Sequence, residues 1–182
     1  MRNRLNRTLS RWRPGMPLSE LLVVVAIIGV LAAVAIPILI DYVRSSKVTE
    51  VQEHLDKCVR GTLKFYQEQR TNATGAATVA ELPDEVSPPV CPQGVATVAD
   101  LDDESRYFDQ TAFPDTFQVI HLEIKDAAYA CYAFEHLGGN PPANAADGFR
   151  CQAWTDLDND DAAAYYEKRA QFNQSTWSFA SG

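Results

Sequence analysis

The sequence lacks the patterns that most enzymes need. Its three histidines, His54, His121 and His136, are far apart along the chain, and it has no Gly-x-Ser-x-Gly elbow, P-loop or His-Glu-x-x-His motif. Its four cysteines form neither a Cys-x-x-Cys pair nor a Cys/His zinc pattern. We therefore predict that the protein is not an enzyme, with no catalytic residue and no required cofactor. We expect His54 to face solvent on a helix.

Acidic residues are absent from the first 15 positions, which contain five arginines, and residues 21–40 contain no charged residue. The rest of the chain is acidic, and the whole sequence has a formal charge of −8. If residues 1–15 are removed, 11 of the 16 basic residues remain against 24 acidic ones, and the charge becomes −13. So acidic a surface repels phosphate backbones, which disfavours nucleic-acid binding by the bulk of the protein.

Residues 21–40 are a run of twenty apolar residues. In a helix that rises about 1.5 Å per residue, this run spans roughly 30 Å, the thickness of the hydrocarbon core of a bilayer. An ordinary cleaved signal peptide has a shorter apolar core, followed by a cleavage site with small residues. The arginines before the run predict a cytoplasmic N-terminus and an external C-terminal domain. The sequence thus predicts a membrane-anchored, exported domain.

One acidic residue, Glu20, stands at the edge of the apolar run. A carboxylate beside hydrocarbon is costly unless it is paired, so such a residue is a functional candidate. The segment around it has a basic leader, a glycine, an apolar residue, a glutamate, and a long apolar helix with an internal glycine and proline. These positions are Gly15, Met16, Glu20, Gly29 and Pro37. Their order closely resembles the class III signal peptide of type IV pilins and of the pseudopilins of type II secretion.

The resemblance implies how the N-terminal segment is processed. Residues 1–15 would be a leader that a membrane-embedded prepilin peptidase removes by cutting between Gly15 and Met16. The same enzyme would methylate the new amine of Met16, which stands where the family usually has Phe. Glu20 would then neutralise the terminal amine of a neighbouring subunit, because opposite charges in a low dielectric attract strongly and relieve each other's burial penalty.

Gly29 and Pro37 also have an implied role in assembly. Gly lowers helix propensity and Pro removes one backbone hydrogen bond, so the helix between them is weak. In the family this stretch can melt on assembly. The alternative is a Gly and a Pro that a membrane helix merely tolerates.

The resemblance further implies a function, which is self-assembly into a type IV pilus-like filament as a major or minor pilin. Its partners would be other pilin subunits, the prepilin peptidase and an inner-membrane assembly platform. The chain would reside in the bacterial inner membrane, with its head in the periplasm, before it joins a pilus at the cell surface. Two alternatives are open: a pseudopilin of a type II secretion system, and a membrane-anchored periplasmic binding domain that does not polymerise. Adhesion, motility, DNA uptake and secretion all fit the sequence.

After Asp41 the helix is predicted to continue with an amphipathic surface. We expect one helix from about Leu18 to Arg70, with a membrane and assembly half at 16–40 and a head-binding half at 41–70. Apolar positions in the second half recur at steps of three and four residues, which places them on one stripe. They are Val48, Val51, Leu55, Val59, Leu63 and Tyr66.

Residues 71–182 are predicted to form a globular head. Residues 71–92 are rich in loop-forming Gly, Pro and Asn. Four predicted strands follow, with connections short enough to favour an antiparallel meander. They begin at Phe117, where Ile120, Leu122 and Ile124 alternate with polar residues, and continue at Tyr129–His136, Phe149–Thr155 and Tyr165–Phe172. The expected fold class is α+β and pilin-like, with a long N-terminal helix packed against a C-terminal antiparallel sheet.

The four cysteines, Cys58, Cys91, Cys131 and Cys151, are expected to form two disulfides, because exported domains fold in an oxidising compartment. If the second and third predicted strands pair, Cys131 lies close to Cys151, which leaves Cys58 for Cys91. Four cysteines allow three pairings, so the sequence does not fix the connectivity.

An aspartate-rich turn is the one cluster in the head that resembles a metal site. Carboxylates at every second position, Asp156, Asp158 and Asp160, can converge on Ca²⁺, which prefers hard oxygen ligands. The complete EF-hand pattern is missing, and a turn rich in Asp for its turn chemistry and solubility explains the same residues. Similar turns in some minor pilin-like proteins have Gly where this chain has Asn159 and Asp161. Calcium is the one cofactor hypothesis that the sequence supports.

Overall fold

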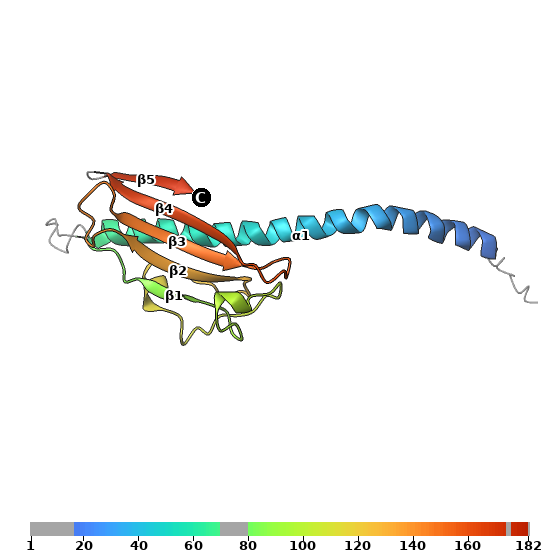
Figure 1. The fold of residues 1–182 in the computed structure, drawn as a ribbon, viewed down its shortest axis with the longest axis horizontal. Coiled ribbons are helices and arrows are strands. Elements are labelled where there is room, and N and C mark those ends of the chain that lie inside the picture. Colours follow the sequence, from blue (N-terminus) through green and yellow to red (C-terminus); the bar gives the residue numbers. More distant parts are fainter. Residues whose placement is uncertain (1–16, 70–79, 174–175, 182) are drawn as a thin grey trace, which may run out of the picture. The chain divides into compact units, whose positions relative to one another are not determined.

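The computed structural model describes residues 17–69, 80–173 and 176–181, and it has the predicted α+β architecture (Figure 1). A long helix precedes a five-stranded sheet in which each strand is antiparallel to its neighbours and the strands lie in sequence order. The elements are α1 (Leu18–Gln69), β1 (Val86–Val90), the short 3-10 helix η1 (Val98–Asp100), α2 (Asp115–Val119), β2 (Ala130–Leu137), β3 (Gly148–Thr155), β4 (Ala164–Asn173) and β5 (Thr176–Ser181).

The long helix α1 begins at Leu18 and ends at Gln69, close to the predicted limits. Among the described residues it is the one helix that is long and apolar enough to cross a membrane, which is compatible with a membrane anchor. The chain divides into two compact units between Tyr42 and Val43. The first unit contains the apolar run, and the second contains the rest of α1 and the head.

In the second unit, α1 packs against one face of the sheet (Figure 1). The predicted apolar stripe is confirmed, because Val51, Leu55, Val59 and Tyr66 are buried and Leu63 is partly buried against the same core. Opposite the stripe, alternate residues of three strands point inward, as the period of two in a strand requires. They are Ala130, Tyr132 and Phe134 of β2, Phe149, Cys151 and Ala153 of β3, and Ala170 and Phe172 of β4.

The predicted strand from Phe117 is wrong. Asp115–Val119 form the short helix α2, and His121 then has a φ of 58°, which turns the chain. The alternating residues that suggested a strand are nevertheless buried, since Ile120, Leu122 and Ile124 all lie in the core. A segment that buries alternate side chains in a core therefore has the same period as a hydrogen-bonded strand, and the sequence does not separate the two.

A glycine in α1 lets this segment approach the helix closely. A Cβ atom added at Gly61 would lie 1.8 Å from the carbonyl oxygen of Ile120, a distance that no real Cβ contact has. Gly61 is thus needed for the close approach of two backbones and not for an unusual φ.

Two strands were missed in the sequence. The first, β1, lies inside the predicted loop region, and the second, β5, follows the last predicted strand. β1 contains Pro88 and Pro89, which cannot donate to a ladder, and it pairs only with β2. Prolines are tolerated at such an edge, so the composition of a loop and of an edge strand can be the same.

The predicted disulfide pairing is also wrong, although all four cysteines do form disulfides. The bonds are Cys58–Cys151 and Cys91–Cys131. β2 and β3 pair as predicted, but the register places Cys131 opposite Trp154, three positions from Cys151. An odd offset puts the two cysteines on opposite faces of the sheet. Cys151 therefore meets α1 on the inner face, and Cys131 meets Cys91 on the outer face.

Candidate functional site

The predicted cleavage and methylation residues, Gly15 and Met16, lie outside the described residues. The first candidate residue with a defined position is Glu20, which is exposed in the first turn of α1. It is the single charged residue between Leu18 and Ile40. A carboxylate near the N-terminus of a helix is stabilised by the helix dipole, so this end of the apolar segment can hold a negative charge.

The apolar segment after Glu20 has no cover from the described part of the chain. Large aliphatic side chains are exposed all around the helix, including Leu22, Val30 and Ile38. Side chains spaced by four residues leave an apolar groove along it, of the kind into which the ridge of another helix fits. The groove is lined by Leu22, Val23, Ala26, Ile27, Val30 and Leu31. Such a surface is stable when lipid or another apolar helix covers it.

Gly29 and Pro37 both lie inside this segment, where the prediction placed them in a weak stretch. The helix is continuous through both positions in this structure. A Cβ atom added at Gly29 would meet nothing within 4 Å, so the glycine is not required by packing within the chain. Any role for Gly29 therefore involves either helix stability or a contact with something outside this chain.

Three contacts of different chemistry fix the head on the second half of α1, each to a different strand. A disulfide, an ion pair and a hydrogen bond at one interface leave the helix little freedom to slide or rotate under the sheet. They are the Cys58–Cys151 disulfide to β3, the 2.6 Å ion pair between Asp56 and Lys168 of β4, and the 2.7 Å hydrogen bond between His54 Nδ1 and the hydroxyl of Tyr132 on β2.

The prediction that His54 faces solvent is wrong, because only 9% of the residue is exposed. Burial lowers the pKa of His54, nearby Lys57 lowers it further, and Glu53 and Asp126 act in the opposite direction. Burial also raises the pKa of the Tyr132 phenol. The sequence did contain a signal for the burial of His54, because its spacing places it on the apolar stripe. The prediction followed the polarity of the side chain instead.

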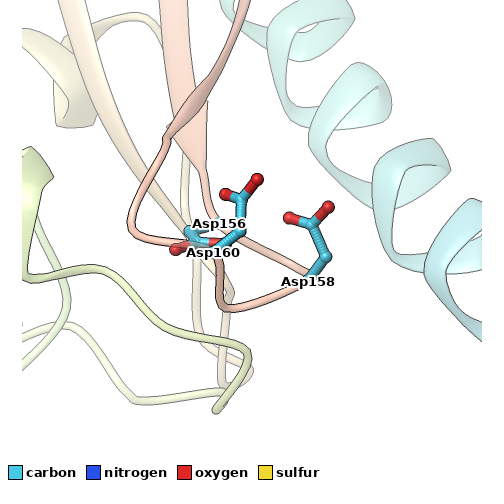
Figure 2. A group of neighbouring side chains, drawn as sticks. All are labelled: Asp156, Asp158 and Asp160. Carbon is cyan, nitrogen blue, oxygen red and sulfur yellow. The ribbon is translucent and has the colours of Figure 1, made fainter.

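The three aspartates of the predicted metal site lie on the loop between β3 and β4 (Figure 2). One carboxylate oxygen from each of Asp156, Asp158 and Asp160 lies within 4.8 Å of the other two. Asp156 is buried and accepts backbone hydrogen bonds from Asn159 at 2.7 Å and from Asp161 at 3.2 Å. Its carboxylate thus closes the turn, whereas the other two carboxylates are exposed.

The same loop has an unusual backbone. Asn159 and Asp161, which stand where similar turns have Gly, have positive φ angles of 55° and 62°. Asn and Asp are the non-glycine residues that adopt this conformation most readily, so the loop keeps the shape without the glycines. One oxygen from each of three carboxylates gives three ligands, fewer than the six to eight that Ca²⁺ takes. Asp156 and Asp160 also accept backbone hydrogen bonds within the loop. The described geometry accounts for Asp156 without a metal.

The chain therefore has two candidate regions in its described part: the exposed apolar segment with Glu20, and the aspartate loop of the head. The apolar segment is the one whose side chains require a partner from outside the chain. No model of a known protein family, no curated protein and no solved structure matches this chain.

Proposed function

We propose that this chain is a structural subunit of a type IV pilus-like filament, a major or minor pilin. A prepilin peptidase removes residues 1–15, and residues 16–40 first anchor the subunit in the inner membrane and then pack against other subunits in the filament. The observation that carries the proposal is an apolar half-helix whose large aliphatic side chains are exposed and whose single charged group, Glu20, lies at its start.

The carboxylate distinguishes assembly from simple anchoring. Lipid covers the aliphatic side chains of the segment equally well in either case. An acidic residue within a membrane helix costs about 2.5–3.5 kcal/mol at its centre and less near its edge, and a bare anchor gains nothing from it. If the methylated amine of Met16 in a neighbouring subunit pairs with Glu20, the two charges offset each other's desolvation and set the axial register. Assembly into a filament thus accounts for an acidic residue at this position.

The head also suits a subunit that leaves the cytoplasm. All four cysteines form disulfides, which persist in the periplasm and at the cell surface. The second half of α1 is covered by the sheet of its own chain, so it needs no partner from elsewhere. Assembly through the first half would leave the heads on the outside of a helical bundle.

The test is Glu20→Gln in cells that contain a prepilin peptidase and assemble surface filaments from this chain. The variant keeps the size and polarity of the side chain and removes its charge. We expect it to reach the inner membrane and to lose its leader, while the amount of protein in sheared filaments falls by at least about tenfold. An antibody against the chain measures its amount in the inner-membrane fraction and in the sheared-filament fraction.

Glu68→Gln is the matched control, because Glu68 is an exposed acid of the same helix in its head-binding half. It should assemble like the wild type. Equal assembly of the Glu20→Gln variant would contradict the proposal. Wild-type filaments that remain in the periplasm would favour the pseudopilin alternative. A wild-type chain that never assembles would favour an anchored binding domain.

A further inference from the structure

The sheet has a second face, opposite the one that α1 covers (Figure 1). By the strand register, this face presents an aromatic and polar patch. Its members lie on the outward positions of three strands, where the register places them directly across from one another. We call them the outer-face patch: Glu135 of β2, Arg150, Gln152 and Trp154 of β3, and Tyr165 and Glu167 of β4.

Two aromatic rings form one end of the patch. The ring centroids of Trp154 and Tyr165 are 5.3 Å apart, and the rings are tilted by 48°. Tyr165 is 45% exposed, whereas Trp154 also packs against the small cluster around the Cys91–Cys131 disulfide. The pair thus offers a ring surface that is held in place from below, together with a hydroxyl group at its edge.

Hydrogen-bonding groups lie beside the rings. The Tyr165 hydroxyl donates to Glu167 at 2.6 Å and accepts from the Gln152 side-chain amide at 2.8 Å. Burial acts to raise the pKa of Glu167, but the hydrogen bond from Tyr165 and the nearby Arg169 outweigh it, and the pKa is lowered. Glu167 is therefore an ionised acceptor that is fixed in position.

One polar atom in the patch has no partner. Gln152 is only 5% exposed, and its Oε1 atom has no hydrogen bond to any described residue. A half turn of the amide exchanges its oxygen and nitrogen, yet one of them still lacks a partner, because the Tyr165 hydroxyl contacts only one. A buried polar atom left in this state loses its bonds to water without replacing them, which is unfavourable. A ligand group that can donate or accept a hydrogen bond would satisfy it.

The charges of the patch are balanced, in contrast to the rest of the chain. Arg150 donates to Glu135 through Nε at 2.9 Å. Arg169, which lies across from Arg150 at the margin of the patch, pairs with Glu167. Two arginines thus offset two glutamates on a protein whose net charge is −8. A neutral ligand fits such a surface better than an anion or a cation does.

From these features we propose that the outer-face patch binds a neutral, hydroxyl-rich ligand, an oligosaccharide. A sugar ring lies against Trp154 and Tyr165. The exposed Tyr165 ring shifts, and the sugar hydroxyls replace its hydroxyl group as the hydrogen-bond partner of Gln152 and Glu167. A protein partner is a poorer fit, because a specific interface needs roughly 800 Å² on each side and most side chains of the patch are largely buried. The proposal does not depend on filament assembly.

The test applies the full-length chain in detergent to an array of neutral, sialylated and sulfated oligosaccharides. We expect retention of neutral glycans, and titration calorimetry then gives the Kd of the best one. Tyr165→Ala should weaken this Kd by about tenfold or more, a loss of about 1.4 kcal/mol. Tyr107→Ala, at an aromatic residue that is 63% exposed and outside the patch, should leave the Kd unchanged.

Gln152→Met separates binding from folding. It removes the unpartnered atom and conserves the side-chain volume, so we expect the same or a higher Tm together with weaker glycan binding. The proposal is overturned if no neutral glycan is retained, if only charged glycans are, or if Tyr165→Ala binds as the wild type does. Self-association that Tyr165→Ala abolishes, with no glycan bound, would instead show a protein interface and also overturn it.

Discussion

Leu31 and Leu55 belong to the same helix, yet 64% of Leu31 is exposed and only 2% of Leu55. Up to Tyr42, large aliphatic side chains are exposed around the whole circumference of α1. Beyond Val43, the apolar side chains are confined to one stripe, which the sheet of the same chain covers. One continuous helix thus contains two surfaces with different requirements.

The comparison teaches that the distribution of apolar residues around a helix predicts where its partner comes from. A single stripe can be buried by one neighbour, and here the chain provides that neighbour. An apolar surface on all sides needs a surrounding medium or several neighbours, which one head cannot supply. The first half of α1 therefore needs lipid or apolar neighbours from outside the described part of the chain, whereas the second half is held by a disulfide and by packing within the chain.

The largest expected effect is a loss of folding free energy when the disulfide between the second half of α1 and β3 is removed. Cys58→Ala with Cys151→Ala opens a loop of 93 residues. The loop-entropy estimate for such a loop is about 4–5 kcal/mol of folding free energy. Urea unfolding of the detergent-solubilised chain, followed by near-UV circular dichroism, measures the loss.

The matched comparison is Cys91→Ala with Cys131→Ala, whose loop has 40 residues and for which the same estimate gives about 4 kcal/mol. Both variants should still reach the membrane, since neither touches the first half of α1. Loss of membrane insertion in either one would mean that the two halves do not act separately.

A leucine substitution in each half tests the comparison directly. Leu55→Ala removes a buried side chain and should lower the free energy of unfolding by about 2–5 kcal/mol. Leu31→Ala removes an exposed one and should change this free energy by less than about 0.5 kcal/mol. Equal losses in the same urea experiment would contradict the assignment of the two surfaces.

The aspartate loop should show a smaller effect, and one that does not require a metal. Asp156→Ala leaves the amides of Asn159 and Asp161 without their acceptor, which should lower stability by about 1–3 kcal/mol. Asp158→Asn, at an exposed position of the same loop, is the control and should change little. Thermal unfolding with calcium and with a chelator checks the alternative. A rise in Tm with calcium that both substitutions abolish would establish a metal site.

Much of the fold was predictable because it depends on local patterns. The uncharged run and the stripe predicted α1 almost to its ends, and strand-like segments separated by short connections predicted β2, β3 and β4. The disulfide pairing was not predictable, because an offset of three residues between Cys131 and Cys151 decides which face each occupies. The burial of His54 was missed because residue type was weighed above its position on the stripe.

The predicted processing site shows a different limit of prediction from sequence. Its prediction depends on the order of Gly15, Met16 and Glu20 in the sequence, and the first two lie outside the described residues. No packing within the chain reports on a role for Glu20, since its proposed partner is a second subunit. The outer-face patch was missed because its members come from three strands and meet only through the register.

The smallest expected effect is a dependence of head stability on pH. Since burial lowers the pKa of His54, the unfolded chain takes up a proton there at a higher pH than the folded chain does. The contribution of His54 to stability is therefore fully present above its ordinary pKa of about 6.5. This contribution is lost as the pH falls toward the lower pKa that His54 has in the folded chain. Wild type should lose more stability between pH of about 7 and about 5 than His54→Gln, in urea unfolding at several pH values.

His121→Gln is the control for this measurement, because it removes an exposed histidine in place of the buried one. The same pH slope in wild type and in the His54→Gln variant would show that His54 takes up its proton equally in both states.

The central claim is that other copies of this chain cover the first half of α1 after assembly, and site-specific cross-linking tests it most directly. All four native cysteines are in disulfides, so Val30→Cys adds a lone free thiol on the exposed apolar surface. Oxidation of sheared filaments should join Val30→Cys chains into disulfide-linked dimers, whereas the matched variant Glu68→Cys, in the head-binding half, should give far fewer. If the Val30→Cys chain remains monomeric in filaments under the same oxidation, the claim is contradicted.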